Sequence, residues 1–244
     1  MEIAVLTIFP EVFEKTLDFS MIKIAREKEA VKFRTVNIRD FAEDKHKTTD
    51  DTPFGGSEGM VMKVEPVYKA LESVKEEGMR VVLLSASGKK LGQDKLLEWS
   101  KLEKLALVCG RYEGVDERLL DFVDEEISIG DYVISGGEFA ALAVIEGVIR
   151  LLPGVLGNEE SSKNESFSTG ILDYPHYTRP REFMGRPVPG ELLSGNHKKI
   201  QEFRRREALR KTLKNRPELL EKAGLTKEDK KMLDEIREEN KENE

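Results

Sequence analysis

Cysteine is nearly absent from this chain: Cys109 is its single representative. One cysteine supplies neither an internal disulfide framework nor the thiolate cluster of a zinc finger, and it is compatible with a reducing cytosol. The sequence also lacks any apolar run near the ~20 residues that a membrane-spanning helix needs. Its apolar amino terminus contains Glu2 and stops at Pro10, which indicates a strand and not a signal peptide. We therefore expect a soluble, cytoplasmic protein without a membrane span.

The chain also has no excess of positive charge: acidic residues outnumber basic residues, and the formal net charge is −7. This balance argues against a nucleic-acid partner, but the distribution of the charges reverses the argument. Residues 196–216 contain nine Lys and Arg residues against two Glu residues, a local excess of seven positive charges. Such a run is typical either of a solvated helix face or of a surface that binds phosphates. Composition alone leaves both interpretations open.

Alternation of strand and helix patterns indicates the fold class. Short aliphatic runs predict buried strands over residues 3–8, 31–38, 79–85 and 104–109. Apolar residues spaced by three and four predict helices over residues 12–29, 65–77, 93–100 and 137–150. This alternation favours an α/β domain whose parallel sheet is covered on both faces.

Changes in composition divide the chain into three parts. We expect an α/β domain over residues 1–156, a flexible interdomain linker over 157–172 and a small all-helical domain over 173–244. Helices of the last part are predicted over residues 196–214, 217–223 and 226 to the end. Thr226 with Asp229 three residues later is typical of a helix cap.

Glycine-rich segments follow the predicted strands. Ser85 to Gly88 follow one strand, Gly110 to Gly114 follow the next, and residues 128–137 open a helix. The first strand has no glycine after it, so the dinucleotide-binding fingerprint is missing, and no phosphate-binding loop of the nucleotide-hydrolase type is present. Ligands of open parallel sheets bind beyond the carboxyl ends of the strands, so three such loops could hold an adenosine through their backbone. Each loop taken singly is more typical of an ordinary turn.

Several ordered motifs together resemble one known family. They are Asp44-Lys45-His46-Lys47-Thr48, Asp50-Asp51, Phe54-Gly55-Gly56, Val108-Cys109-Gly110-Arg111-Tyr112-Glu113-Gly114, Asp116-Glu117-Arg118, Ser128-Ile129-Gly130-Asp131-Tyr132-Val133, Ser135-Gly136-Gly137-Glu138, Pro153-Gly154-Val155-Leu156-Gly157 and Pro175-His176-Tyr177-Thr178-Arg179-Pro180. Over nearly its whole length the chain resembles the bacterial tRNA (guanine-N1)-methyltransferases, which methylate the guanine 3′ of the anticodon, tRNA position 37.

This resemblance implies a fold that the hydrophobic periodicity of the sequence does not predict. It implies a SPOUT-like parallel sheet whose carboxyl-terminal part forms a trefoil knot, an obligate homodimer, and a tRNA site shared between subunits. The knot loops would hold S-adenosylmethionine in a bent shape. Carried onto this sequence, the cofactor-binding residues are Leu84, Ser85, Gly110, Tyr112, Glu113, Ile129, Gly130, Asp131, Tyr132, Val133, Ile134, Gly136 and Gly137.

Methylation of guanine N1 needs a base and a cation. N1 carries a proton at neutral pH, and removing it spreads negative charge toward O6. A carboxylate shielded from water can take the proton, and an arginine can stabilise the charge on O6. The resemblance implies Arg150 as the cation and Glu165 as the base, although many relatives carry Asp at the latter position. Asp173, which also matches a family acid, is the alternative base or a positioning group.

The basic segment is the expected tRNA contact, through His197, Lys198, Lys199, Arg205 and Arg206. We expect no structural metal, because the three histidines are too scattered for a metal motif; a role for Mg²⁺ in the reaction stays open, but no acidic cluster indicates a site. Cys109 ends an apolar run, so a buried, inert thiol is favoured over a nucleophile. Two other functions stay open: a non-catalytic RNA-binding protein, and a related knotted methyltransferase acting on ribose 2′-hydroxyls or another base.

Overall fold

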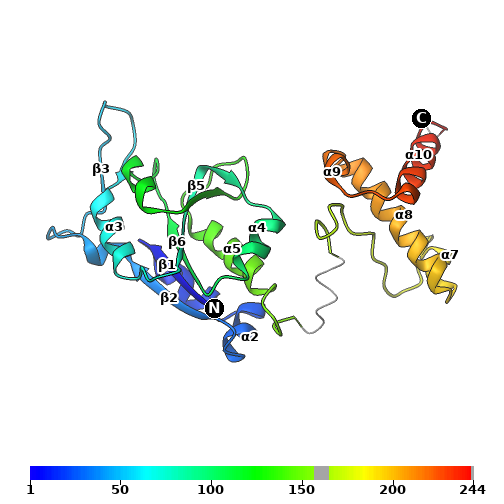
Figure 1. The fold of residues 1–244 in the computed structure, drawn as a ribbon, viewed down its shortest axis with the longest axis horizontal. Helices are drawn as coiled ribbons and strands as arrows, with labels where there is room; N and C mark the ends of the chain where they lie inside the picture. The colour runs from blue at the N-terminus through cyan, green and yellow to red at the C-terminus, as the bar shows by residue number, and fades with distance from the viewer. Residues whose placement is uncertain (157–164, 243–244) are drawn as a thin grey trace. The chain divides into compact units, whose positions relative to one another are not determined.

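The chain folds into two compact units, Met1–Gly157 and Asn158–Glu244, which we call the first and second unit. The structure is a computed structural model, and it describes residues 1–156 and 165–242 (Figure 1). Among these residues no helix combines the length and the apolar character needed to cross a bilayer.

A five-stranded parallel sheet forms the centre of the first unit. Its strands are β1 (Glu2–Thr7), β2 (Lys32–Asn37), β5 (Arg80–Lys90), β6 (Lys104–Cys109) and β7 (Glu125–Ser128). They are arranged in the order β2-β1-β6-β5-β7, and every pairing is parallel. The predicted α/β class with a parallel sheet is therefore confirmed for this unit.

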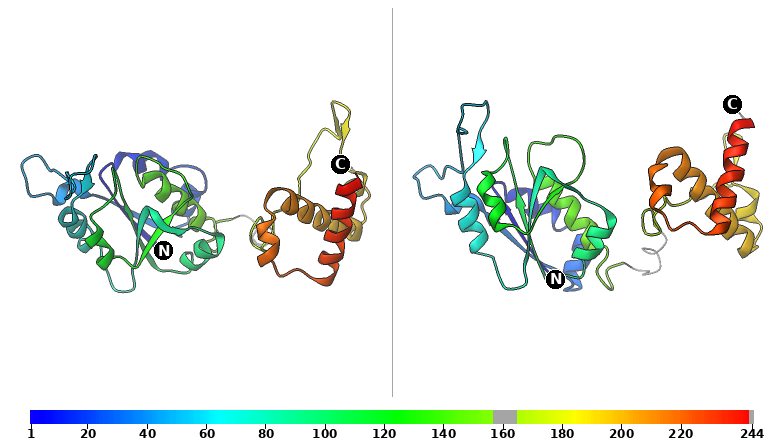
Figure 2. Two further views of the ribbon diagram at one scale, coloured as in Figure 1. Left: turned by 90° about the horizontal axis from the view of Figure 1, so that it is seen from above. Right: turned by 45° about the horizontal axis from the view of Figure 1, so that its top comes forward.

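Helices cover both faces of this sheet, as Figures 1 and 2 show. One face packs against α1 (Glu11–Thr16), α2 (Ser20–Glu27), α4 (Gln93–Trp99) and α5 (Glu138–Ile149). The other packs against α3 (Val64–Glu72) and the 3₁₀ helices η1 (Ile38–Phe41) and η2 (Glu117–Phe122). Side chains alternate along each strand, so Leu107 of β6 lies in the first core and Val108 in the second. This double burial explains why β1, β6 and the first half of β5 are nearly continuous apolar runs.

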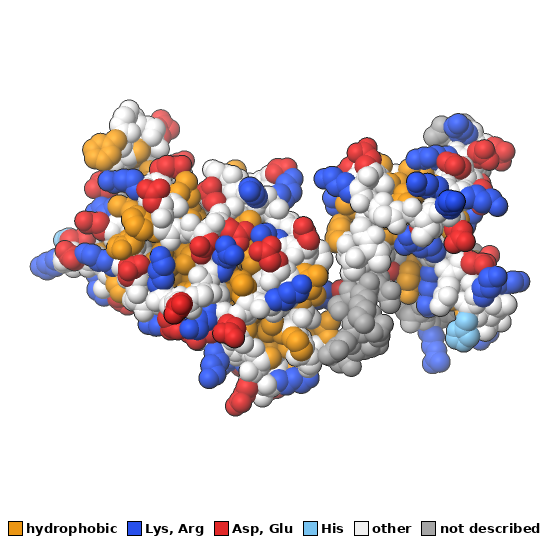
Figure 3. Space-filling model, in the orientation of Figure 1, with side chains coloured by type: hydrophobic (Ala, Val, Ile, Leu, Met, Phe, Trp, Pro, Cys, Tyr) orange, Lys and Arg blue, Asp and Glu red, His pale blue; other side chains and the backbone are white. Residues whose placement is uncertain are grey.

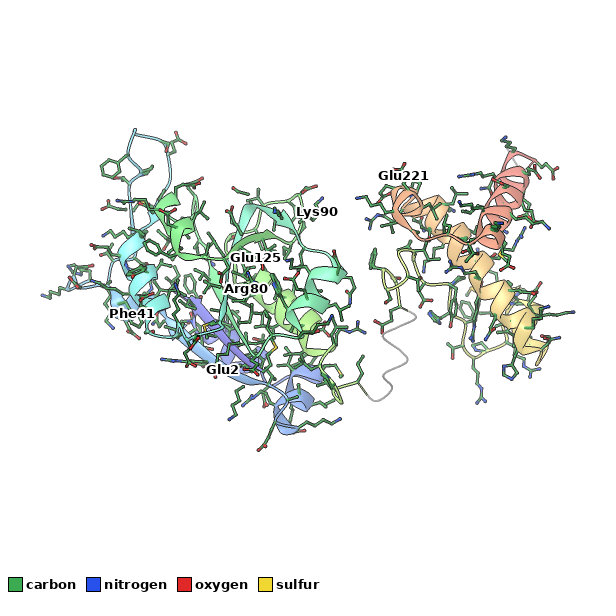
Figure 4. The ribbon with its side chains drawn as sticks, in the orientation of Figure 1. Glu2, Phe41, Arg80, Lys90, Glu125 and Glu221 are labelled. Atoms are coloured by element: carbon green, nitrogen blue, oxygen red, sulfur yellow. The ribbon has the colours of Figure 1, made fainter. Side chains whose placement is uncertain are left out.

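Several elements of the first unit differ from the sequence-based expectation: the short strands β3 (Asp50–Asp51) and β4 (Val61–Met62) were not predicted, and α3 ends earlier than the helix expected over residues 65–77. The helix predicted over residues 12–29 is interrupted, because Phe19 is extended and Ser20 has a φ of 49°. Strand β7 was missed because it is short and begins with two glutamates. One of these, Glu125, lies 3.7 Å from the Arg80 guanidinium of β5 and 2.9 Å from the Lys95 ammonium, and the first of these pairs is visible in Figure 4. Ion pairing at the sheet edge thus replaces the apolar signal that marks the other strands.

The second unit is built mainly of helices. They are α7 (Gly190–Leu193), α8 (His197–Asn215), α9 (Glu218–Lys222) and α10 (Lys227–Glu242). The predicted cap of α10 is confirmed, because Asp229 N donates to Thr226 Oγ1 at 3.1 Å and Thr226 N donates to Asp229 Oδ2 at 2.9 Å. The unit is not entirely helical, however, since β8 (Glu182–Phe183) and β9 (Arg186–Pro187) form an antiparallel hairpin. Short polar strands of two residues carry no periodic signal, which is why the sequence did not predict them.

Part of the predicted linker packs onto the second unit. Ile171 is 2% exposed in a core with Leu209, Leu233 and Ile236. The backbone N–H of Leu172 donates to Thr212 Oγ1 of α8 at 3.0 Å. Residues 157–164 of that predicted linker lie outside the described residues. The described remainder, 165–172, is therefore held by contacts to α8 and α10.

Candidate functional site

A pocket of about 310 Å³ lies at the carboxyl end of the sheet. It is formed where β5, β6 and β7 end and where the chain enters α5. All the predicted cofactor residues except one line it: Leu84, Ser85, Gly110, Tyr112, Glu113, Ile129, Gly130, Tyr132, Val133, Ile134, Gly136 and Gly137. The exception is Asp131, whose carboxylate is 82% exposed and pairs with Lys90 at 2.5 Å. Three glycine-rich loops far apart in the sequence thus form one cavity.

Glycine is required at this site by close backbone contacts. A Cβ on Gly137 would lie 2.8 Å from Cys109 Cα, and one on Gly88 would lie 2.3 Å from the backbone nitrogen of Ile127. Neither neighbour can move without shifting a strand. Gly137 N also donates to Gly110 O at 2.8 Å, which fastens the start of α5 to the end of β6. The glycines therefore bring the loops together and leave main-chain groups facing the cavity.

A fourth segment packs against the loop that follows β6, outside the residues that line the pocket. It is β4 (Val61–Met62), which pairs with β3 (Asp50–Asp51). Glu113 N donates to Met60 O at 3.0 Å, and Met62 N donates to Gly114 O at 2.9 Å. A Cβ on Gly59, which has a φ of +89°, would lie 2.5 Å from the Glu113 side chain. The Glu113 carboxylate is therefore directed at the segment that carries the quoted Phe54-Gly55-Gly56 motif.

A buried polar network supports the pocket from the sheet side. Glu138, the first residue of α5, is 2% exposed. Thr7 Oγ1 donates to its Oε1 at 2.8 Å, and Arg111 Nη1 donates to its Oε2 at 3.2 Å. The Arg111 guanidinium lies 4.4 Å above the centre of the Phe9 ring. The sequence analysis assigned no role to Arg111 or Glu138, although charged residues inside two glycine-rich motifs were a signal.

Cys109 ends β6 next to this network. Its thiol is fully buried. Burial, together with the nearby carboxylate of Glu138, raises the pKa of the Cys109 thiol well above its usual range. A thiol in this state is protonated at neutral pH, which agrees with the predicted inert role.

Arg150 lies at the opposite end of α5 from the pocket. It is the C-cap of the helix, whereas Gly137 is its N-cap. A rise of 1.5 Å per residue places the two backbones roughly 20 Å apart. Arg150 does not line the pocket. Within one chain, the predicted cation and the predicted cofactor site are therefore not brought together.

The two candidate bases lie on one turn of the second unit. Asp173 N donates to Ser166 Oγ at 3.0 Å, which ties Asp173 to the residue that follows Glu165. Both carboxylate oxygens of Asp173 are engaged: Oδ1 accepts from the backbone N–H of Tyr174 at 2.8 Å, and Oδ2 lies 2.8 Å from His176 Nε2. Glu165 is half-buried. The Asp173–Ser166 hydrogen bond places the two candidate bases on one turn, and Asp173 has the contacts of a positioning group.

The basic segment is confirmed as a helix, α8, but its charges are used unevenly. Asn196 caps the helix, and the next three residues, His197, Lys198 and Lys199, are exposed. Further along, three arginines pair with carboxylates. The pairs are Arg205 with Asp229, at 2.7 and 2.9 Å, Arg206 with Glu235 and Glu239, and Arg210 with Glu207 and Glu239. On the face of the second unit seen in Figure 3, Lys and Arg side chains accordingly lie beside Asp and Glu.

These pairs change the interpretation of Arg205 and Arg206. Both were predicted to contact RNA, and both hold α10 against α8 instead of standing free at the surface. A local excess of charge in the sequence could not show this, because the partners lie more than 20 residues further along the chain. RNA contact by these two residues stays a prediction, with a structural role beside it. In the described ranges, no group of three or more His, Cys, Asp or Glu side chains is placed to hold a metal ion.

Comparison with known proteins gives a consistent result. Residues 1–222 match the family described as tRNA (Guanine-1)-methyltransferase TrmD. The tRNA (guanine-N(1)-)-methyltransferase of Dictyoglomus turgidum is 53% identical over 239 residues, which cover 98% of each chain. The enzymes of the same name from Carboxydothermus hydrogenoformans and Bacillus cereus are 51% and 49% identical, and the matches cover 96% and 98% of this chain and 92% and 99% of theirs.

Proposed function

The chain belongs to the tRNA (guanine-1)-methyltransferase family, and from this membership we propose that it transfers a methyl group from S-adenosylmethionine to N1 of the guanine at tRNA position 37. The relatives at about half identity over nearly full length are named for methylation of guanine N1 in tRNA. The chain is accordingly an enzyme acting on tRNA, and the non-catalytic alternative and the alternative target atoms are set aside.

The pocket at the sheet's carboxyl end carries the proposal for the cofactor. Its volume of about 310 Å³ falls within the range of small-molecule sites. Glycines at positions where a Cβ would strike the backbone leave main-chain groups to bind an adenosine and a methionine moiety. When bound, S-adenosylmethionine supplies an electrophilic methyl group on a sulfonium. The hydrogen bonds that Glu138 accepts from Thr7 and Arg111 would hold the segments around the pocket in place for the cofactor.

Residues of this chain would then prepare the guanine. Glu165 would accept the N1 proton on its carboxylate, and Asp173 would fix the turn that carries it through Ser166. The Arg150 guanidinium would donate hydrogen bonds to O6, where negative charge develops once the proton leaves. If Glu165 proves dispensable, Asp173 is the base.

We propose a homodimer with an active site at the subunit interface. The distance of roughly 20 Å between Gly137 and Arg150 along α5 supports this arrangement, because one chain cannot present both to the same base. A second copy could bring its Arg150 to the pocket of the first.

The trefoil knot is part of the proposal as well. Strand β6 lies between β1 and β5, and the chain then returns to β7 on the far side of β5. The start of α5 afterwards passes back against the end of β6, where Gly137 N bonds Gly110 O. These crossings at one end of the sheet are compatible with threading through a loop.

The second unit would bind tRNA through α8, with His197, Lys198 and Lys199 as the exposed group and Arg205 and Arg206 as support. The cytoplasm, where tRNA is modified, is the proposed location, and Mg²⁺ stays a candidate activator without a site in the described residues.

Methyl transfer to a tRNA transcript tests the function directly. Purified protein with S-adenosylmethionine should form 1-methylguanine at position 37, and a transcript with adenine there should stay unmodified. Digestion to nucleosides followed by mass spectrometry identifies the product. Absence of 1-methylguanine with an intact, folded protein would overturn the proposal.

A further inference from the structure

The second unit has a pocket of its own, separate from the cofactor pocket. It has a volume of about 380 Å³ and is bounded by residues 174–181, by α7 and by α8. Its apolar part includes Leu192 and Ile200, and both are half-buried. The size is that of a small-molecule or single-nucleotide site. Nothing in the reaction described above uses it.

Planar side chains line this pocket. The rings of Tyr174 and His176 have centroids 4.6 Å apart and are tilted by 46°. The Arg204 guanidinium lies 4.9 Å from the centre of the Tyr174 ring. Tyr177 also lines the pocket and is 48% exposed. Aromatic rings and guanidinium planes of this kind are the surfaces on which proteins stack unpaired bases of RNA.

The charge of the pocket points to an anionic ligand. Arg179, Arg181 and Arg204 line it, and no Asp or Glu does. In the described part of the chain none of these three arginines has an ion pair, whereas their neighbour Arg205 is held by both oxygens of Asp229. The arginines that join α8 to α10 in this unit are each paired with a carboxylate. The pocket arginines are instead available to a phosphate, which arginine binds well.

We infer that this pocket binds one unstacked nucleotide of the tRNA, other than the guanine that is methylated, with the base on the aromatic side chains and the phosphate on the arginines. The inference rests on the proposed function. A base that is extracted for chemistry leaves its neighbours partly unstacked. Stacking tolerates any base because every base has a π-face, so the pocket adds affinity and register without reading the sequence.

Two pairs of matched variants of the full-length protein test the inference. Tyr177→Leu removes a pocket ring, and Phe183→Leu removes a ring that is 63% exposed outside the pocket. Arg181→Gln removes a pocket cation, and Arg186→Gln removes an exposed cation from β9, outside the pocket. The pocket variants should raise the KM for tRNA about tenfold, which corresponds to ~1.4 kcal/mol, with kcat and calorimetric S-adenosylmethionine affinity unchanged. The control variants should behave as the unaltered protein.

A second readout does not depend on methyl transfer. 2-Aminopurine is placed at each anticodon-loop nucleotide in turn, and its fluorescence is followed as protein is added. One position should be quenched by stacking with the unaltered protein and with Phe183→Leu, but not with Tyr177→Leu. Pocket variants that match their controls in both assays would overturn the inference while leaving the methyltransferase proposal intact. Quenching and tRNA binding that persist without any 1-methylguanine would instead remove the proposed reaction and keep the pocket.

Discussion

Arg111 and Glu138 form an ion pair beside the cofactor pocket, with Arg111 Nη1 at 3.2 Å from a carboxylate that is 2% exposed. The pair joins the loop after β6 to the first turn of α5, and Thr7 at the end of β1 completes it. Glu138 also lies at the positive end of the α5 dipole, which favours a carboxylate. One buried side chain therefore fixes three segments that meet at the candidate site.

Removing the charge of Glu138 should loosen the pocket. Glu138→Gln keeps the size of the side chain but leaves Arg111 without its counter-charge. We expect the free energy of unfolding to fall by about 2 to 3 kcal/mol, the range for hydrogen bonds to a charged group, and S-adenosylmethionine affinity to fall at least tenfold. Chemical denaturation and calorimetry measure the two effects. Glu146→Gln, an exposed position on the same helix, is the control, and equal behaviour of the two variants would contradict a role for the pair.

Arg150 should act on the pocket of the other subunit. Arg150→Ala should slow single-turnover methyl transfer by roughly 100- to 1000-fold, the effect of losing one oxyanion donor, without changing cofactor affinity. Gly137→Val should abolish cofactor binding, because its Cβ would lie 2.8 Å from Cys109 Cα.

Co-expression of the two variants under different affinity tags then decides the geometry. A heterodimer regains one intact site if Arg150 serves the partner's pocket, so about half the normal activity per dimer should return. If Arg150 served its own pocket, both sites of the heterodimer would be damaged. An inactive, correctly assembled heterodimer would therefore contradict the proposal that the two subunits share the active site.

Kinetic measurements should distinguish the role of Glu165 from that of Asp173, the two carboxylates on the turn that contains Ser166. Glu165→Gln should reduce the single-turnover rate by roughly 100- to 10,000-fold, as expected for a lost general base, at unchanged S-adenosylmethionine affinity. Asp173→Asn should have a smaller effect and retain the acidic limb of the pH–rate profile, since Asp173 holds His176 and the Tyr174 backbone. A near-normal rate in Glu165→Gln together with a flat profile in Asp173→Asn would transfer the role to Asp173.

The Arg205–Asp229 pair should make the second unit sensitive to acid. The Arg205 guanidinium, aided by hydrogen bonds from Thr226, lowers the pKa of Asp229 from 3.8 to about 2. The folded-state pKa is below that of the unfolded chain, so the stabilisation is complete above about pH 4 and is lost as the pH falls toward 2. The shift corresponds to roughly 2 kcal/mol.

Asp229→Asn should therefore lower the stability of the second unit at neutral pH by about that amount or more, because the Arg205 side chain loses its partner. The difference from the unaltered protein should shrink below pH 4. Urea unfolding at a series of pH values, followed by circular dichroism, measures it. Asp234→Asn is the matched control, because Asp234 pairs with Arg237 on the same helix and the two side chains are 70% and 54% exposed. A pH-independent difference would show that the ion pair is not its cause.

Local patterns were sufficient for much of the fold. Apolar runs predicted β1, β2 and β6 nearly to the residue, and helical spacing predicted α4, α5 and α8. The Thr226–Asp229 cap was predictable because both partners lie within one helical turn. Strand β7 was not, because it begins with two glutamates and its pairing partner β5 lies far back in the chain. The β8–β9 hairpin was not, because strands of two residues are too short to show a period. Periodicity reports burial, and these elements are not buried on both faces.

The sequence by itself determined which residues could form the site: nearly all of the cofactor residues that the glycine-rich motifs and their resemblance to one enzyme family predicted do line the pocket. Only the tertiary structure decided how charges are used. It paired Arg205 and Arg206 with α10, left Arg179, Arg181 and Arg204 beside aromatic rings, buried Glu138 between Thr7 and Arg111, and placed Arg150 far along α5 from Gly137. The reason is that a residue's type is local, whereas the partner that neutralises or orients its charge is set by contacts between segments distant in the chain.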